Sequence, residues 1–393
     1  MSASTSGRSV FSGLRSPAVC GALGHPDPAR VRAMMTFFPG RTLQVVHEDQ
    51  SSVLAMDRDP LRWGRSGALG LGRTHGLAWI EGVPWSPGAA SWEEAAVRGA
   101  CGLAVEGRRR LVHSSVNGLG PVYWMTDGDA VYFATRIDPL VQTSPRQLSI
   151  DWDAWSSIIT LRFPASDRTP FAEVRRLPPC STLTWRRGAA VAVQERWPWA
   201  QVEPHLDRHE VGEALAASLR ATVAGVGQPA LVPLSGGRDS RMLAVAFAEA
   251  GLAERAITVS DDEGDRFEEG PARMVAESLG LEHDKRRARP EDYPRNWRVR
   301  ARAVEHQFVD HAWLVPLARY VARRDLPVSD GFAIDTLLGW GNRFFTPETI
   351  DVSDPRRASL ALFDSMRRYG RADLALAEPL RETVVERSRA LFL

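Results

Sequence analysis

Apolar and polar positions alternate in short runs over the first half of the chain. Short apolar runs that end at turn residues are typical of antiparallel strands. Asp127 and Gly128 separate two aromatic-rich runs, which indicates a β-hairpin. We expect few helices here, and residues 27–38 and 91–99 are the best helical candidates. The strand-like runs are LQVVHE, LAWIEG, RRLVHSSV, PVYWMT, AVYFATR, STLTWRRG and AVAVQERW.

The apolar spacing becomes helical in the second half, where strand-like and helix-like segments alternate. Gly251 and Gly280 are the glycines expected just after two of these helices. Such alternation predicts a doubly wound α/β domain, whose parallel sheet is covered on both faces. The helices are expected at 209–225, 240–251, 267–280, 311–324 and 382–393, and the strands at 229–234, 255–260 and 326–330.

The two patterns predict two domains on either side of a proline-rich linker, WPWAQVEPHLD. Residues 1–19 are small and polar, so we expect a disordered N-terminus. Residues 20–199 form the N-terminal α+β domain with antiparallel sheet, and residues 208–393 form the C-terminal α/β domain.

The composition argues against several classes of function but identifies none. The net charge is +1, so nothing favours general attraction to nucleic acid or to a membrane. Lys285 is the only lysine among 49 basic residues. Three widely spaced cysteines argue against a zinc site or a disulfide framework and favour the cytoplasm. We find no secretory signal and no apolar run of membrane-spanning length.

The junction between the strand at 229–234 and the helix at 240–251 reads SGGRDS. Gly236 and Gly237 permit a tight turn whose amides, with the first turn of the helix, favour an anion. The hydroxyls of Ser235 and Ser240 add donors. An acid here, Asp239, would repel phosphate unless a divalent cation lay between them. The junction therefore predicts a site for magnesium-bound polyphosphate, and a glycine-rich turn capped by Asp239 is the alternative.

SGGRDS resembles the pyrophosphate loop of the N-type ATP pyrophosphatases, which have the adenine nucleotide α-hydrolase-like fold. Two later segments, DRFEEGPARMVAESLGLEHD and VSDGFAIDTLLG, are similar to elements of the asparagine synthetase-like group. The resemblance covers residues 228–339. The N-terminal half resembles the class II glutaminase domain, an Ntn-hydrolase-like fold, in VCGALGHPDP, in LVHSSVNGLGPVYWMTDGDAVYFATRIDPLV and in VRRLPPCSTLTWRRG.

The resemblance implies ATP and Mg²⁺ as cofactors and carboxylate activation as the chemistry. Asp239 and Asp335 would share the metal, and Glu305 resembles an acid used near the acyl-adenylate. Glu268, at the start of a helix, is either a family acid or a residue that complements the helix dipole. The phosphates would be held by Ser235, Gly236, Gly237 and Ser240, and adenosine would be contacted by Pro233, Leu234, Val259, Asp330 and Gly331.

Departures from the family pattern change the expected reaction. A class II glutaminase needs its cysteine at the N-terminus, whereas Cys20 is catalytic only if translation starts at Val19. The glutamine-binding segments of that domain have no counterpart, so we expect a degenerate domain with a structural Cys20. Thr336 follows Asp335 where the family usually has Glu, a departure shared with ring-forming relatives such as β-lactam synthetases and lasso-peptide macrolactam cyclases.

The family's helical C-terminal region and its catalytic lysine also have no counterpart here. We therefore expect that the chain is truncated, that a partner protein replaces this region, or that the chain is inactive. The Arg-rich run at 284–302 either grips an acidic peptide or phosphate or forms a solvated face.

Three functions follow from these expectations. The first is an ATP-dependent amide ligase that acts on a peptide or a small-molecule carboxylate, and the favoured form of it is a macrolactam-forming cyclase. The second is a glutamine- or ammonia-dependent asparagine synthetase. The third is a non-catalytic remnant that binds a nucleotide.

Overall fold

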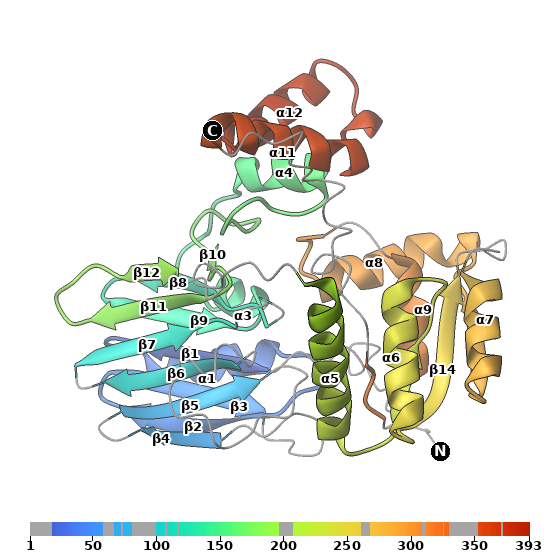
Figure 1. Ribbon diagram of the computed structural model, residues 1–393. Helices are drawn as coiled ribbons and strands as arrows, with labels where there is room; N and C mark the ends of the chain where they lie inside the picture. Colours follow the sequence, from blue (N-terminus) through green and yellow to red (C-terminus); the bar gives the residue numbers. More distant parts are fainter. Residues whose placement is uncertain are drawn as a thin grey trace, which may run out of the picture. The chain divides into compact units, whose positions relative to one another are not determined.

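The structure is a computed structural model. It describes residues 18–57, 67–71, 74–80, 100–106, 108–115, 118, 120–195, 207–260, 268–308, 312–324, 326–329, 353–370 and 372–393. The chain divides into two compact units, Met1–Ile150 with Asp167–Leu206 and Asp151–Ser166 with Asp207–Leu393. Each unit has a hydrophobic core of its own, and each is described by itself (Figure 1).

The described part of the first unit contains two six-stranded sheets, and every strand pair in them is antiparallel, as the alternating pattern predicts. The first sheet has the order β10 (Arg175–Arg176), β8 (Tyr123–Asp127), β9 (Ala130–Ala134), β1 (Val19–Leu23), β3 (Ser52–Asp57) and β2 (Leu43–Asp49). The second has the order β12 (Ala192–Glu195), β11 (Ser181–Arg186), β7 (Arg109–His113), β6 (Ala100–Glu106), β5 (Thr74–Ile80) and β4 (Gly67–Leu71).

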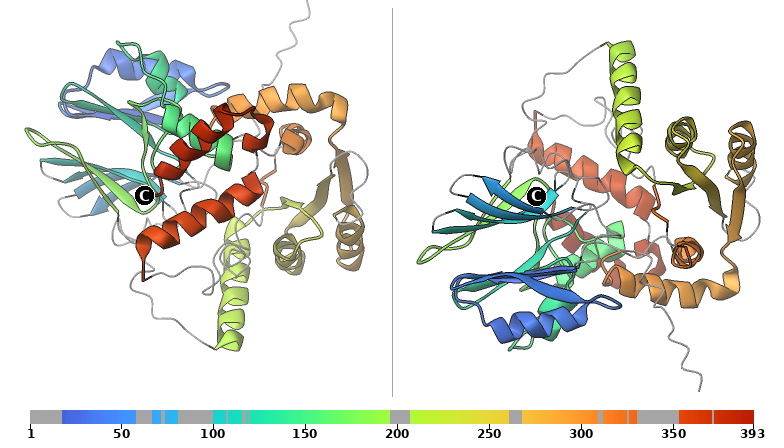
Figure 2. Two further views of the ribbon diagram at one scale, coloured as in Figure 1. Left: turned by 90° about the horizontal axis from the view of Figure 1, so that it is seen from above. Right: turned by 90° about the horizontal axis from the view of Figure 1, so that it is seen from below.

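The two sheets stack, and the apolar side chains between them form one core (Figure 2). Phe133 of the first sheet and Leu103 of the second are both fully buried in it. A second core lies on the other face of the first sheet, under α1 (Pro28–Met34) and α3 (Asp138–Gln142). The helix predicted at 27–38 is thus α1 and the short 3-10 turn after it, whereas 91–99 lies outside the described residues.

The second unit contains a parallel sheet of β13 (Ala230–Pro233), β14 (Ala253–Ser260) and β15 (His283–Arg287). Residues 327–329 pair in parallel with the free edge of β13. There the Leu231 N–H donates to the Pro327 carbonyl (2.8 Å), and the Ser329 N–H donates to the Leu231 carbonyl (3.0 Å). The spatial order is therefore 327–329, β13, β14, β15, and the strand order reverses at β13.

Helices pack on both faces of this parallel sheet. On one face, Phe247 packs in a core shared by α5 (Arg208–Val226), α6 (Arg238–Glu249) and α7 (Glu269–Ser278). On the other, Leu231 and Ile257 pack against Tyr320 of α9 (Val315–Val321). Between β15 and α9 the chain forms α8 (Tyr293–Ala303).

The second unit also contains a group of helices that includes a segment from the middle of the chain. Helix α4 (Trp152–Leu161) packs with α11 (Pro355–Gly370) and α12 (Leu380–Ala390), and Asp153 pairs with Arg387 at 3.3 Å. The sequence patterns singled out α12 but not α4. No helix in the described part of the chain combines the length and hydropathy needed to cross a bilayer.

Candidate functional site

The SGGRDS segment forms the turn between β13 and α6. It lies at the carboxyl end of β13, next to the point where residues 327–329 join the sheet on the opposite side from β14. In open parallel sheets, ligands bind outside the carboxyl ends of the strands where the strand order reverses. The turn therefore occupies the position in the second unit where a ligand is most expected.

Ser235 and Ser240 of the turn are hydrogen-bonded to each other. The Ser235 N–H donates to the Ser240 Oγ (3.0 Å), and the two hydroxyl oxygens are 2.9 Å apart. The Ser235 Oγ in turn accepts from the Gly237 N–H (3.1 Å). Hydroxyls that the sequence suggested as ligand donors thus hold the turn in shape, so the loop is ordered by its own side chains.

One backbone N–H of the loop donates a hydrogen bond to a carboxylate. The Gly236 N–H donates to the Oε2 of Glu268 (2.8 Å), which directly precedes α7. No side chain caps α6, whose first turn contains Asp239. A Cβ on Gly237 would lie 3.1 Å from the Ser235 Oγ, so the cradle is tight. The loop therefore already binds an anionic oxygen through a backbone amide.

A buried chain of hydrogen bonds connects the residue before the loop to β14 and β15. The Thr258 hydroxyl donates to the Leu234 carbonyl (2.7 Å) and accepts from the Nε2 of His283 (2.7 Å). Burial, and then the charge of Lys285, lower the pKa of His283, so the neutral ring with a proton on Nε2 is favoured. The Nδ1 of His283 has no partner among the described residues.

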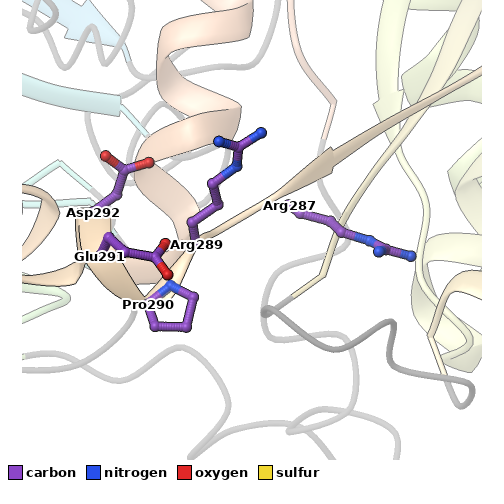
Figure 3. A pocket seen from close by; sticks show the side chains of 5 residues that line it. All are labelled: Arg287, Arg289, Pro290, Glu291 and Asp292. Atoms are coloured by element: carbon purple, nitrogen blue, oxygen red, sulfur yellow. The ribbon is translucent and has the colours of Figure 1, made fainter.

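Beyond β15, at the same edge of the sheet, lies a hollow of about 650 Å³ (Figure 3). Arg289 and Asp292 point to one side of it, and Arg287 extends from the strand away from them. Arg287 pairs with Glu269 (3.2 Å), and its hydrogen bond lowers the pKa of that carboxyl despite burial. The lining residues are Arg287, Arg289, Pro290, Glu291 and Asp292.

The structure positions only part of the predicted set. Pro233 ends β13 and Val259 lies on β14 beside it, both at the edge that carries the loop. Asp330, Gly331 and Asp335 lie outside the described residues. Consequently the pairing of Asp239 with Asp335 around a metal stays a prediction. Within the described ranges, no cluster of three or more His, Cys, Asp or Glu side chains could hold a metal ion.

Glu305 lies in the turn that follows α8, with a backbone φ of +51°. His306 is also left-handed, with φ of +60°. Such conformations cost non-glycine residues of order 1–3 kcal/mol each and occur preferentially at functional sites. The backbone is thus strained where the resemblance suggests a catalytic acid.

The nucleophile role considered for Cys20 does not fit its surroundings. Cys20 is fully buried in β1, in the core that α1 and α3 cover. Burial raises the pKa of its thiol far above the ordinary value. A reactive cysteine needs exposure and thiolate character, and Cys20 has neither.

Thr258 and His283 are functional candidates that the sequence did not identify. Glu268 was considered as a family acid or as a residue that complements the helix dipole, but its contact with the loop was not predicted. The contacts of Thr258 and His283 depend on how β14 pairs with its neighbours, and the contact of Glu268 depends on where α7 begins. The only signal that the sequence offered for such contacts was a polar residue at the end of a buried strand.

No family model matches this chain, and no curated protein matches it in sequence. Among solved structures, the chain is similar to glutamine phosphoribosylpyrophosphate (PRPP) amidotransferase from B. subtilis complexed with ADP and GMP. The identity is 9%, the TM-score is 0.30, and the match covers 68% of this chain and 65% of that one. The match thus spans less than two thirds of that protein, and at this TM-score it carries no weight for fold or chemistry.

Proposed function

We propose that the second unit binds ATP with Mg²⁺ at the loop after β13 and activates a carboxylate, which an amine then captures as an amide. The observation that carries this proposal is the Gly236 amide, which holds a carboxylate oxygen at 2.8 Å in an ordered SGGRDS turn. Oriented amides at the positive end of a helix dipole suit phosphate oxygens as well as carboxylates. The position of the turn, beside the reversal of strand order, supports the same ligand.

The residues present fit a polyphosphate with a divalent cation. A side chain at Gly237 would crowd the Ser235 Oγ, so the tight turn depends on glycine there. Among the described residues, no side chain caps α6 and competes for its first amides. Asp239 in the first turn and Asp335 would hold Mg²⁺ through oxygen atoms, which this ion prefers. The cation would neutralise charge that develops on the leaving pyrophosphate.

The reaction forms two bonds in sequence. A carboxylate oxygen attacks the α-phosphorus of ATP, and the bond from that phosphorus to pyrophosphate breaks. The amine nitrogen then attacks the acyl carbon, the bond to AMP breaks, and the nitrogen loses a proton. Arg289 has no ion-pair partner among the described residues, and it would offer a guanidinium to the incoming carboxylate.

We infer that carboxylate and amine belong to one peptide, so that the product is a macrolactam. The resemblance to ring-forming relatives supports this substrate class. The burial of Cys20 disfavours the alternative of an asparagine synthetase fed by glutamine hydrolysis. A non-catalytic nucleotide-binding remnant is the third candidate.

Calorimetry with ATP and MgCl₂ tests the nucleotide site. We expect magnesium-dependent binding that Asp239→Asn weakens by about tenfold or more, the value of one strong charge interaction. Asp364→Asn in α11, which removes the same charge from an exposed position, should leave the affinity unchanged. Absence of binding to folded protein would refute the proposal. Binding without substrate-dependent release of AMP and pyrophosphate would instead favour the remnant.

A further inference from the structure

The first unit contains a cavity of about 790 Å³ that has no part in the proposed nucleotide chemistry. It lies between the β8–β9 turn at Gly128 and the β11–β12 turn at Gly188, next to His25. Its volume is within the range of about 300–1,000 Å³ that is usual for small-molecule sites. We call it the indole pocket, because Trp124 and Trp185 both line it.

The two tryptophans of the indole pocket differ in their hydrogen bonding. The Nε1 of Trp185 donates to the Asp129 carbonyl (3.0 Å), and its ring meets the His25 ring edge-on, with centroids 6.5 Å apart. The Nε1 of Trp124 is buried and has no acceptor among the described residues. Both N–H groups are therefore out of reach of a ligand, which would contact the rings of the two tryptophans.

Arginines line one side of the pocket. Arg186 and Arg187 belong to its lining, and both are exposed. Neither forms an ion pair with a carboxylate of the described residues. Among the described residues that line the pocket, Asp129 is the only acid. The local charge therefore favours an anionic ligand.

Strand register concentrates further positive charge beside the pocket. Arg109 of β7 lies directly opposite Arg186 of β11, and exposed Arg108 precedes it. Like charges directly opposite each other destabilise a strand pair. On its other side, Arg109 lies opposite Glu106 of β6, so this like-charge pair is partly compensated. The excess positive charge of the two hairpins still favours an anion near Arg186 and Arg187.

We propose that the indole pocket binds an aromatic ring that carries a carboxylate. The ring would pack against Trp124 and Trp185, and the carboxylate would be held by Arg186 and Arg187. Two sources have this chemistry, a free aromatic acid and the C-terminal aromatic residue of a peptide. The site does not depend on nucleotide binding by the second unit.

Calorimetry on the full chain tests the pocket with two ligands, 2-naphthoate and acetyl-Gly-Gly-Phe with a free carboxylate. We expect at least one of them to bind. Acetate, 2-naphthamide and the C-terminal amide of the peptide should each bind at least about tenfold more weakly than their matched ligand, because each lacks the ring or the charge. Binding of the peptide alone identifies a peptide end as the source, and binding of 2-naphthoate alone identifies a free acid.

The double variant Arg186→Gln with Arg187→Gln should weaken binding by about tenfold or more. Arg356→Gln with Arg357→Gln removes the same charge from exposed positions of α11 and should leave binding unchanged. Trp124→Leu keeps an apolar side chain but removes the ring, so we expect about fivefold weaker binding. The proposal is overturned if neither ligand binds to folded protein, if acetate binds as tightly as 2-naphthoate, or if the Arg186 and Arg187 variant binds like the wild type.

Discussion

The backbone N–H of Gly236 and the carboxylate of Glu268 are joined by a hydrogen bond of 2.8 Å. Gly236 belongs to the turn after the first parallel strand, and Glu268 directly precedes the helix after the second. Through this bond, a carboxylate oxygen of the protein itself lies beside the Gly236 N–H. A phosphate group that used the same amide would have to displace this carboxylate.

Glu268→Gln tests that competition. The amide oxygen of Gln can still accept from Gly236, but the negative charge is gone. We expect Mg-ATP to bind about tenfold more tightly, because a like charge near the phosphates is removed. Calorimetry measures the change, and Glu277→Gln on the exposed side of α7 is the matched control. Weaker binding in the Glu268 variant would show that this acid supports the ligand.

Ser240→Ala should destabilise the second unit by about 1–2 kcal/mol, because the Ser235 N–H loses its acceptor. Urea unfolding measures the difference. Ser388→Ala is the control, since that hydroxyl is fully buried and has no partner among the described residues. Its removal should be neutral or stabilising, and equal losses for both variants would contradict a structural role for the serine pair.

Gly21→Ala should prevent correct packing of the first unit. A Cβ there would lie 2.4 Å from the Val53 carbonyl and 2.6 Å from the Phe133 ring. Overpacking of this kind costs about 1–3 kcal/mol or more. Gly212→Ala in α5 meets nothing within 4 Å and should stabilise the helix by about 0.5–1 kcal/mol. Thermal unfolding of the two variants should therefore shift in opposite directions.

His283 should make stability depend on pH. Burial lowers its pKa in the folded state, so below the unfolded pKa of about 6.5 the unfolded chain binds the proton more readily. The contribution of His283 to stability is therefore present above pH 6.5 or so and is lost as the pH falls towards the folded pKa. His283→Gln keeps a donor for Thr258 but does not titrate. Urea unfolding across this range should show a shallower slope for the variant, and equal slopes would refute the assignment.

Arg186→Glu should convert a repulsive cross-strand pair with Arg109 into an attractive one. Opposite charges at such positions contribute about 0.2–1 kcal/mol, so the first unit should become more stable. The same change should weaken binding of 2-naphthoate, because the pocket loses one guanidinium and gains a carboxylate that repels the ligand. Unfolding and calorimetry on one preparation check both effects. Unchanged stability would mean that solvent screens the pair.

Local pattern was sufficient for many of the elements and for the location of the loop, but it did not identify α4. The alternation of apolar residues predicted antiparallel strands before residue 199, and the pair Asp127–Gly128 marks the observed β8–β9 turn. Helical spacing and Gly251 predicted α6 and its end. These features depend on residues a few positions apart, whose periodicity and turn preferences act within each segment.

Tertiary structure alone decided which distant groups meet. Strand pairing aligned Arg109 with Arg186, and it left Cys20 on the buried face under α1. The start of α7 brought Glu268 to the Gly236 amide. Each of these contacts joins residues far apart in the chain. Strand order, register and helix packing determine them, and a periodic pattern of apolar residues is compatible with many registers.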